Sequence, residues 1–146
     1  KMVRLATKED HLDLLLLAKQ FLKEYNTNYS IDLSALSESV LTMVDDPNFL
    51  VLVLDKDGSV EGLLCATIGS PFFSKDKVSS ELAWFLNKDG RGKKEYALII
   101  DAYEKCAKSK ECKFITMSDI DMLTDLRPLY ESRGYTLTEK TYVKEI

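Results

Sequence analysis

The residues best suited to chemistry lie in one stretch whose pattern predicts a strand, a turn and a long helix. Residues 81–86 are mostly apolar and aromatic, which is typical of a buried strand. Residues 87–92 (Asn-Lys-Asp-Gly-Arg-Gly) favour a turn, and apolar side chains then recur at helical spacing. A glycine-bearing turn that opens a helix presents free N–H groups and the positive end of the helix dipole. Because Arg91, Lys93 and Lys94 lie there, we predict a site for a phosphate-bearing, anionic ligand.

The chain offers little material for a metal site. His11 is the single histidine, and the three cysteines form no CxxC pair, so a zinc site lacks ligands. The acidic residues Asp119, Asp121 and Asp125 lack a glycine-centred calcium loop and its terminal glutamate. We interpret them as a solvated loop that caps the next helix, and we predict no metal.

The composition is that of one soluble globular domain spanning residues 1–146, with 45% hydrophobic and 30% charged residues. The formal net charge of −4 argues against a nucleic-acid partner and against an anionic membrane surface. No apolar run approaches the ~20 residues of a membrane span, and no signal peptide opens the chain. An odd number of unclustered cysteines favours buried, reduced thiols, so we expect a cytoplasmic protein.

Hydrophobic periodicity predicts the elements that must position this stretch. Helices are expected up to about Tyr25, over 35–44, from about Lys93 onward, and over 126–133. Apolar runs predict strands at 3–6, 49–54, 60–68, 81–86, 114–117, 135–137 and 141–143. This order predicts the α/β class, specifically a mixed α+β sheet of six to seven strands flanked by about four helices. Its one parallel crossover is expected to be right-handed.

This element order and two local motifs resemble the GNAT superfamily of N-acetyltransferases. The first motif, residues 84–92 (WFLNKDGRG), is similar to the family's fourth strand and the start of its pyrophosphate loop. The second, residues 129–135 (LYESRGY), is similar to the Leu-Tyr-Glu-Lys-x-Gly-Phe ending common in the family. The loop is degenerate, because Lys94 and Tyr96 stand where the pattern Arg/Gln-x-x-Gly-x-Gly/Ala expects small residues. Small residues allow the backbone to approach the pyrophosphate closely.

The resemblance implies an N-acetyltransferase in which a primary amine attacks acetyl-CoA directly. Tyr130 matches the family tyrosine that protonates the leaving thiolate, and Glu81 is the best-placed base for the amine. A backbone N–H near 84–86 is expected to stabilise the oxyanion. The structural alternatives are a core aromatic for Tyr130 and a paired or solvent-facing glutamate for Glu81.

The same resemblance implies two sets of binding residues, with acetyl-CoA as co-substrate. The residues expected at the cofactor are Trp84, Leu86, Arg91, Gly92, Lys93, Lys94, Glu95, Tyr96 and Met117. The residues expected to line the acceptor site are Tyr25, Tyr29, Phe72 and Phe73, although the two phenylalanines are also suited to anchoring their loop on the core. The acceptor is expected to be a small-molecule or protein amine.

Two other functions remain open at this stage. A GNAT-fold binding or interaction module without catalysis is favoured by the altered loop. A small-ligand sensor domain of another α/β class predicts a continuous sheet without a splayed central pair. Pairing of sheet edges into a homodimer is compatible with the element order.

Overall fold

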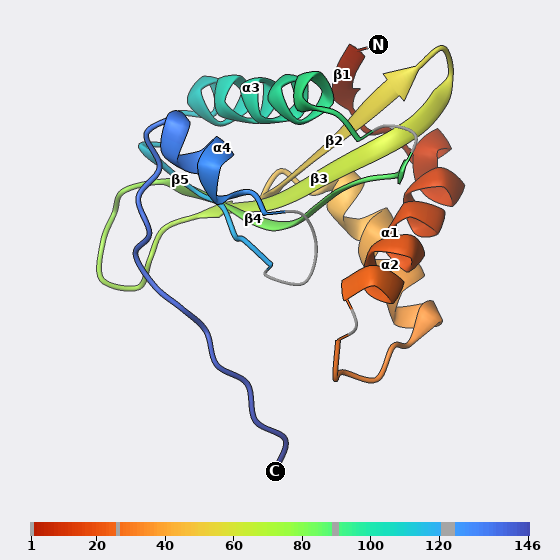
Figure 1. Cartoon of the computed structure of the whole chain (residues 1–146), viewed down its shortest axis with the longest axis horizontal. Helices are drawn as coiled ribbons and strands as arrows, with labels where there is room; N and C mark the ends of the chain where they lie inside the picture. The colour runs from red at the N-terminus through yellow and green to blue at the C-terminus, as the bar shows by residue number, and fades with distance from the viewer. Residues whose placement is uncertain (1, 26, 89–90, 121–124) are drawn as a thin grey trace.

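The computed structural model describes residues 2–25, 27–88, 91–120 and 125–146. The fold is built on one five-stranded sheet with the strands in sequence order (Figure 1). The strands are β1 (Met2–Leu5), β2 (Phe49–Lys56), β3 (Ser59–Gly69), β4 (Val78–Leu86) and β5 (Phe114–Thr116). Neighbouring strands are antiparallel except β4 and β5, which run parallel. A parallel pair needs a crossover connection, and the long helix α3 (Lys93–Ser109) supplies it.

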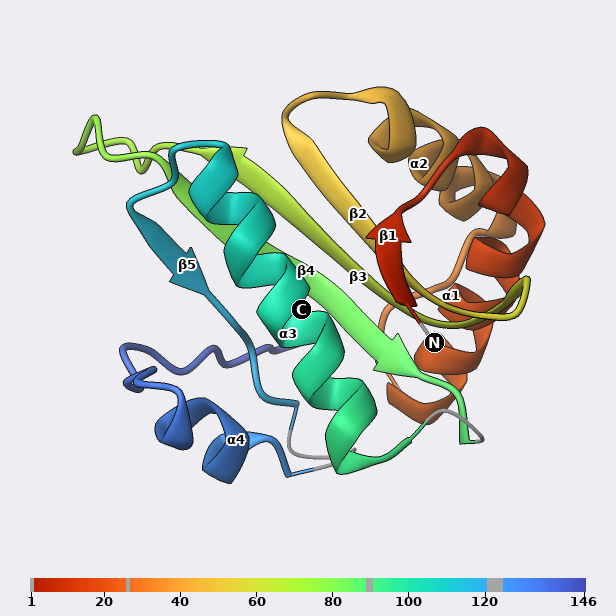
Figure 2. The same cartoon turned by 90° about the horizontal axis from the view of Figure 1, so that it is seen from above.

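The helices cover both faces of the sheet. Helices α1 (His11–Tyr25) and α2 (Leu33–Asp45) lie on one face, and α3 crosses the other with the short α4 (Arg127–Ser132) beside it (Figures 1 and 2). A single 3-10 turn, η1 (Lys8–Asp10), leads into α1. No helix among the described residues is both long and apolar enough to cross a membrane.

Strand β2 shows why the central strands are apolar at every position. Leu50, Leu52 and Leu54 belong to the core under α3, whereas Val51 and Val53 belong to the core under α1 and α2. All five are at most 9% exposed, because each face of the strand is covered by a helix layer. The sequence therefore shows a continuous apolar run rather than an alternating one.

Most predicted elements are found within a few residues of their expected bounds. The predicted hairpin between β2 and β3 turns at Asp57 and Gly58, whose φ angles of 52° and 87° explain the glycine. Helix α2 is capped by Asp32, whose side chain accepts a hydrogen bond from Ala35 N at 3.0 Å. Two predictions fall partly outside the described residues: the turn over 87–92, of which 89–90 are not described, and the acidic loop, of which Asp121 is not described.

The predicted closing strands at 135–137 and 141–143 are wrong. The described structure has five strands, not six or seven, and the chain after Tyr135 runs away from the body without secondary structure (Figure 1). These residues are β-branched and aromatic, which favours strands, but strand formation also requires a partner. No strand in the described part of the chain pairs with this segment, so its strand propensity is not realised.

Candidate functional site

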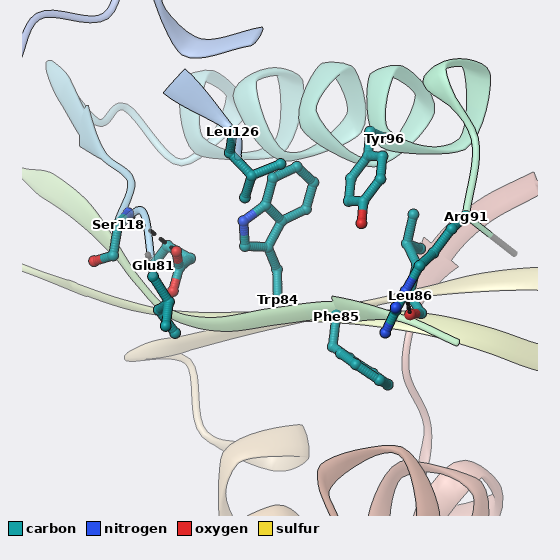
Figure 3. Close-up of a pocket in the computed structure, with 9 residues that line it drawn as sticks. Glu81, Trp84, Phe85, Leu86, Arg91, Tyr96, Ser118 and Leu126 are labelled. Carbon is teal, nitrogen blue, oxygen red and sulfur yellow. Dashed lines mark hydrogen bonds between the residues drawn. The ribbon is translucent and has the colours of Figure 1, made fainter. Parts of the chain in front are cut away.

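The sheet opens between β4 and β5. The two strands pair at Val78–Phe114, Ser79–Ile115 and Ser80–Thr116. After Thr116 the chain separates from β4, which continues to Leu86. A pocket lies in the opening, between the sheet and α3 (Figure 3). It is lined by Glu81, Trp84, Phe85, Leu86, Arg91, Tyr96, Ser118, Ile120 and Leu126. Its cavity volume of about 30 Å³ is room for about one water molecule.

A β-bulge in β4 explains why Glu81 and Trp84 both point into this pocket. The register with β3 shifts between Cys65, which pairs with Ala83, and Ala66, which pairs with Glu81. Leu82 is left without a partner and is 48% exposed. Because side chains alternate along a strand, residues three apart face opposite ways unless a bulge inserts one extra residue. The bulge therefore brings the carboxylate and the indole to the same face of the sheet.

Glu81 is a buried carboxyl group at the open end of the β4–β5 pair. It is 8% exposed, and burial raises its pKa to about 7. The backbone N–H of Ser118 donates a hydrogen bond to Glu81 Oε1 at 3.1 Å, which partly offsets the effect of burial (Figure 3). A carboxyl group with a pKa near neutrality is able to accept and release a proton at physiological pH.

Tyr130 lies beside this carboxyl group, but its hydroxyl already has two partners. It donates a hydrogen bond to the carbonyl oxygen of Ser118 at 2.7 Å and accepts one from Trp84 Nε1 at 3.0 Å. Burial, and secondly the charge of Glu81, raise the pKa of Tyr130 well above its usual value. The hydroxyl is therefore protonated at neutral pH, and the backbone of Ser118 links it to Glu81, since Ser118 accepts from Tyr130 through its carbonyl oxygen and donates to Glu81 through its N–H.

Trp84 and Tyr96 fill the space between β4 and α3. Their rings meet edge to face with centroids 5.3 Å apart, and Trp84 also stacks on Tyr130 at 6.3 Å. Figure 3 shows both side chains directed into the pocket from opposite walls. Leu86, on the same face of β4, is 1% exposed. The predicted cofactor residues Trp84, Leu86 and Tyr96 are thus brought together, and their own side chains occupy most of the room.

Arg91 faces α1 rather than the start of α3. Its Nε donates to the carbonyl oxygen of Leu86 at 2.7 Å, and its NH2 nitrogen pairs with Glu24 Oε2 at 2.5 Å. The guanidinium also lies over the Phe85 ring, 5.0 Å from its centroid. The cation expected at a pyrophosphate is therefore used to tie the end of β4 to α1.

The first turn of α3 carries its own carboxylate. Gly92 is the N-cap and has no side chain to satisfy the free N–H groups. Glu95 lies at the third position of the helix, and its Oε2 is so close to Gly92 that a side chain at position 92 would collide with it. An anion at a helix N-terminus is stabilised by the free N–H groups and the dipole. Glu95 thus lies where a phosphate is predicted, while Lys93 and Lys94 are exposed beside it.

The remaining predicted site residues lie outside the pocket lining. Met117 packs against the core under α3, and Tyr25 packs against Phe21 on the opposite face of the sheet, with ring centroids 5.5 Å apart. Tyr29 is 69% exposed. Phe72 and Phe73 are 101% and 77% exposed and contact each other, so they do not anchor their loop on the core.

Four lining residues were not predicted from the sequence: Phe85, Ser118, Ile120 and Leu126. Ser118 is the most informative of them, because both its N–H and its carbonyl oxygen bond to predicted catalytic side chains. The available signal was its position: it follows the end of a parallel strand, where binding sites of α/β sheets form. Within the described residues, no group of three or more His, Cys, Asp or Glu side chains is placed to hold a metal ion.

Comparison with known proteins identifies the fold. No protein-family model matches the chain. No curated protein matches it significantly in sequence. A transcriptional regulator from Bacillus halodurans C-125 superimposes with a TM-score of 0.81 at 17% identity, covering 99% of both chains. A ribosomal-protein-alanine N-acetyltransferase from Brucella melitensis biovar Abortus 2308 gives 0.75 at 16% identity over 100% of both chains.

A GNAT family acetyltransferase from Staphylococcus aureus is also similar, with a TM-score of 0.71 at 19% identity, over 99% of this chain and 98% of that one. At these identities the likeness concerns the fold alone. The GNAT-like mixed sheet predicted from the sequence is confirmed, with a smaller number of strands.

Proposed function

We propose that this protein is an N-acetyltransferase that transfers an acetyl group from acetyl-CoA to a primary amine. The observation that carries the proposal is Glu81, a buried carboxyl group with a pKa of about 7 at the point where β4 and β5 separate. Structural carboxylates are usually exposed or paired with a cation, whereas Glu81 is buried and receives a hydrogen bond from the backbone N–H of Ser118. A raised pKa at a cleft is typical of a general base.

In this proposal Glu81 accepts the proton that the amine must lose. Acetyl-CoA supplies an acyl group activated as a thioester. The amine is a nucleophile only when neutral, so a base with a pKa near the working pH assists the attack. Beyond Ser80 no strand among the described residues pairs with this edge of β4, and its backbone N–H groups are suited to stabilising the developing oxyanion.

Tyr130 remains our candidate for the proton donor to the leaving thiolate. Its raised pKa keeps the hydroxyl protonated. Its proton is directed at the carbonyl oxygen of Ser118, so donation to a thiolate requires the hydroxyl to change partner. The hydroxyl proton must therefore turn from the Ser118 carbonyl oxygen toward the thiolate during turnover.

The splayed strands and the N-terminus of α3, whose cap residue Gly92 has no side chain, support a CoA-type co-substrate. Two side chains stand in its place, Glu95 at the N-terminus and Tyr96 in the opening, and a third, Arg91, is paired with Glu24 instead. The proposal requires Glu95 and Tyr96 to adopt other rotamers when the co-substrate binds. We assign the diphosphate to residues 92–96 and the pantetheine arm to the space beside Trp84 and Leu86.

The acceptor is proposed to be a small-molecule or protein amine. The similar Brucella melitensis protein is a ribosomal-protein-alanine N-acetyltransferase, which favours a protein amine as the first class to assay. We place the reaction in the cytoplasm, since the three cysteines are free thiols.

The experiment that tests this function measures the melting temperature and thiol release together. Acetyl-CoA at millimolar concentration is expected to raise the melting temperature, and an amine panel is expected to release free CoA thiol. Glu81→Gln should keep the melting shift and lower kcat/KM by at least roughly a hundredfold. Glu61→Gln is the matched control, because Glu61 is equally buried on β3 but does not line the pocket. A flat melting temperature together with no thiol release would refute the proposal.

A GNAT-fold binding module without catalysis is the second candidate. It is favoured by one observation, that the protein's own Glu95 lies against the N-terminus where the diphosphate is expected. In that case acetyl-CoA leaves the melting temperature unchanged, and so does CoA without the acetyl group.

A further inference from the structure

Residues 136–146 form an extended arm that contributes nothing to the body of the molecule. Every residue of the arm is exposed, and it has no helix or strand. Figure 1 shows it running away from the sheet to the C-terminus. Its large apolar side chains are bare: Leu137 is 77% exposed, Tyr142 90%, Val143 63% and Ile146 111%. Four large apolar side chains within eleven residues are unusual for a solvated tail, because such tails are polar and low in β-branched and aromatic residues.

The composition of the arm is that of a strand. It contains the β-branched or aromatic residues Thr136, Thr138, Thr141, Tyr142, Val143 and Ile146. It contains no proline or glycine that would prevent pairing. The arm is therefore a strand without a partner in its own chain.

The root of the arm is held firmly. Tyr135 donates its hydroxyl proton to Glu104 Oε2 on α3 at 2.9 Å, and its backbone N–H bonds to the carbonyl oxygen of Tyr130 at 3.0 Å. Gly134 turns the chain there with a φ of 86°. Because both contacts fix Tyr135 against α3 and α4, the arm leaves the molecule in a defined direction.

The sheet has an open edge on the same side. β5 is the last strand in the sheet order, and no described strand pairs with its outer edge. Phe114, in this strand, is 53% exposed. Exposed N–H and C=O groups on an edge strand pair readily with an added strand. The arm and the outer edge of β5 are thus complementary, because each has backbone N–H and C=O groups that a neighbouring strand could pair.

The total surface area also indicates a chain that is incomplete as a monomer. A compact monomer of 16.6 kDa is expected to expose about 7,600 Å². This chain exposes 9923 Å². The excess of about 2,300 Å² per chain, or about 4,600 Å² for two chains, lies in the range of roughly 2,000–5,000 Å² that obligate homodimer interfaces bury in total. Reciprocal exchange of two arms would remove surface of this order.

We propose that the protein forms a two-fold dimer in which the arm of each copy adds a strand to the outer edge of β5 in the other copy. Figures 1 and 2 both place α4, from which the arm leaves, on the β5 side of the molecule and away from β1. With root and edge on one side, a single two-fold axis allows both exchanges at once and closes the assembly. Pairing with the distant β1 edge would instead link copies head to tail into an open chain.

Sedimentation and light scattering of the full chain test the proposal. The expected mass is twice 16.6 kDa at tens of micromolar protein. A chain ending at Tyr135 is expected to run as a monomer with an unchanged circular dichroism spectrum of the body. Because the arm does not pack on the body, its removal does not unfold the protein. A monomeric full chain, an open-ended polymer, or a truncated chain that still dimerises would each overturn the proposal.

A second pair of variants keeps the arm at full length. Thr138→Pro combined with Thr141→Pro removes two backbone donors and should abolish the dimer, whereas Thr138→Ser with Thr141→Ser should retain it.

Cysteine cross-linking distinguishes exchange from folding back. Thr116→Cys in one preparation is mixed with arm variants Thr138→Cys, Lys140→Cys or Tyr142→Cys in another. Oxidation is expected to give a disulfide-linked dimer with at least one arm position, above the background of the unmodified chain. Cross-linking only within one chain, in the corresponding double variants, would show that the arm folds back on its own β5 and would overturn the proposal.

Discussion

The two halves of β4 have opposite environments. The first half, Val78–Ser80, is paired on both sides, and its buried Ser79 hydroxyl bonds to the Tyr103 hydroxyl on α3 at 2.8 Å. The second half, Glu81–Leu86, is paired with β3 on one side and is open toward β5 on the other. Its buried Glu81 accepts a hydrogen bond from the backbone N–H of Ser118. In the paired half a buried polar group is neutral and satisfied, which stabilises the fold. In the open half a buried polar group is ionisable, which costs stability and makes chemistry available.

The largest effect is expected in the paired half, from Tyr103. Its side chain is 0% exposed, so Tyr103→Ala should lower the free energy of unfolding by roughly 3–5 kcal/mol. Tyr103→Phe keeps the ring but leaves the Ser79 hydroxyl buried without its partner, at a cost of about 1–3 kcal/mol. Adding Ser79→Ala to Tyr103→Phe should recover part of that loss. Urea unfolding measures all three; additive single-variant losses would contradict the coupling.

The next effect is expected at Glu81, as a dependence of stability on pH. Its folded pKa of about 7 lies above the ordinary 4.5. A raised carboxyl pKa means that the folded state holds the proton more tightly, so protonated Glu81 contributes fully to the free energy of unfolding below pH 4.5. As the pH rises from 4.5 to 7, the free energy of unfolding should fall by about 3 kcal/mol. Above pH 7 Glu81 should cause no further change. Glu81→Gln should remove this slope in urea unfolding measured at several pH values. An unchanged slope would show that Glu81 ionises normally.

The sequence predicts that β4 is a strand, but it does not predict how the side chains of its open half are oriented. The strand, the turn and α3 follow from apolar runs and helical spacing, and two of the predicted site residues, Glu81 and Trp84, line the same pocket. The bulge at Leu82, which turns both side chains to one face, has no signal in the local pattern. Arg91 illustrates the same limit, because its ion pair joins it to Glu24, 67 positions earlier in the chain. Contacts of that kind are decided by tertiary packing.

The C-terminal segment shows the complementary error. Residues 135–143 have strand propensity, and the prediction of strands there assumed a partner within the chain. Propensity reports how well side chains suit a pleated surface, not whether an edge is within reach. Ser118 was missed for a related reason: it acts through its backbone, which carries no residue-specific signal.

A smaller effect is expected at Tyr130, where the open half meets α4. Tyr130→Phe leaves Trp84 Nε1 and the carbonyl oxygen of Ser118 without this partner, at a cost of about 1–2 kcal/mol in unfolding free energy. If the hydroxyl also protonates the thiolate, kcat falls by roughly a hundredfold while KM changes little. Tyr135→Phe is the control, because it removes a part-buried tyrosine hydroxyl of the same region that bonds to Glu104 instead. Equal kcat in the two variants would leave Tyr130 a purely structural residue.

The smallest effect concerns the end of the open half, where Glu95 competes with a diphosphate for the N-terminus of α3. Glu95→Gln removes the charge, so affinity for CoA should rise by about two- to fivefold, since a charge at a helix end contributes 0.3–1 kcal/mol. The same charge stabilises the helix, so without ligand the variant should melt slightly below the parent protein. Glu111→Gln, just beyond the C-terminal cap of α3, makes the same change in net charge but should neither raise the affinity for CoA nor lower the melting temperature. Calorimetric titration with CoA measures the affinity. Weaker binding by Glu95→Gln would mean that this carboxylate supports the site rather than occupying it. Glu81 would then be the carboxyl group that distinguishes the open half of β4 from the paired half.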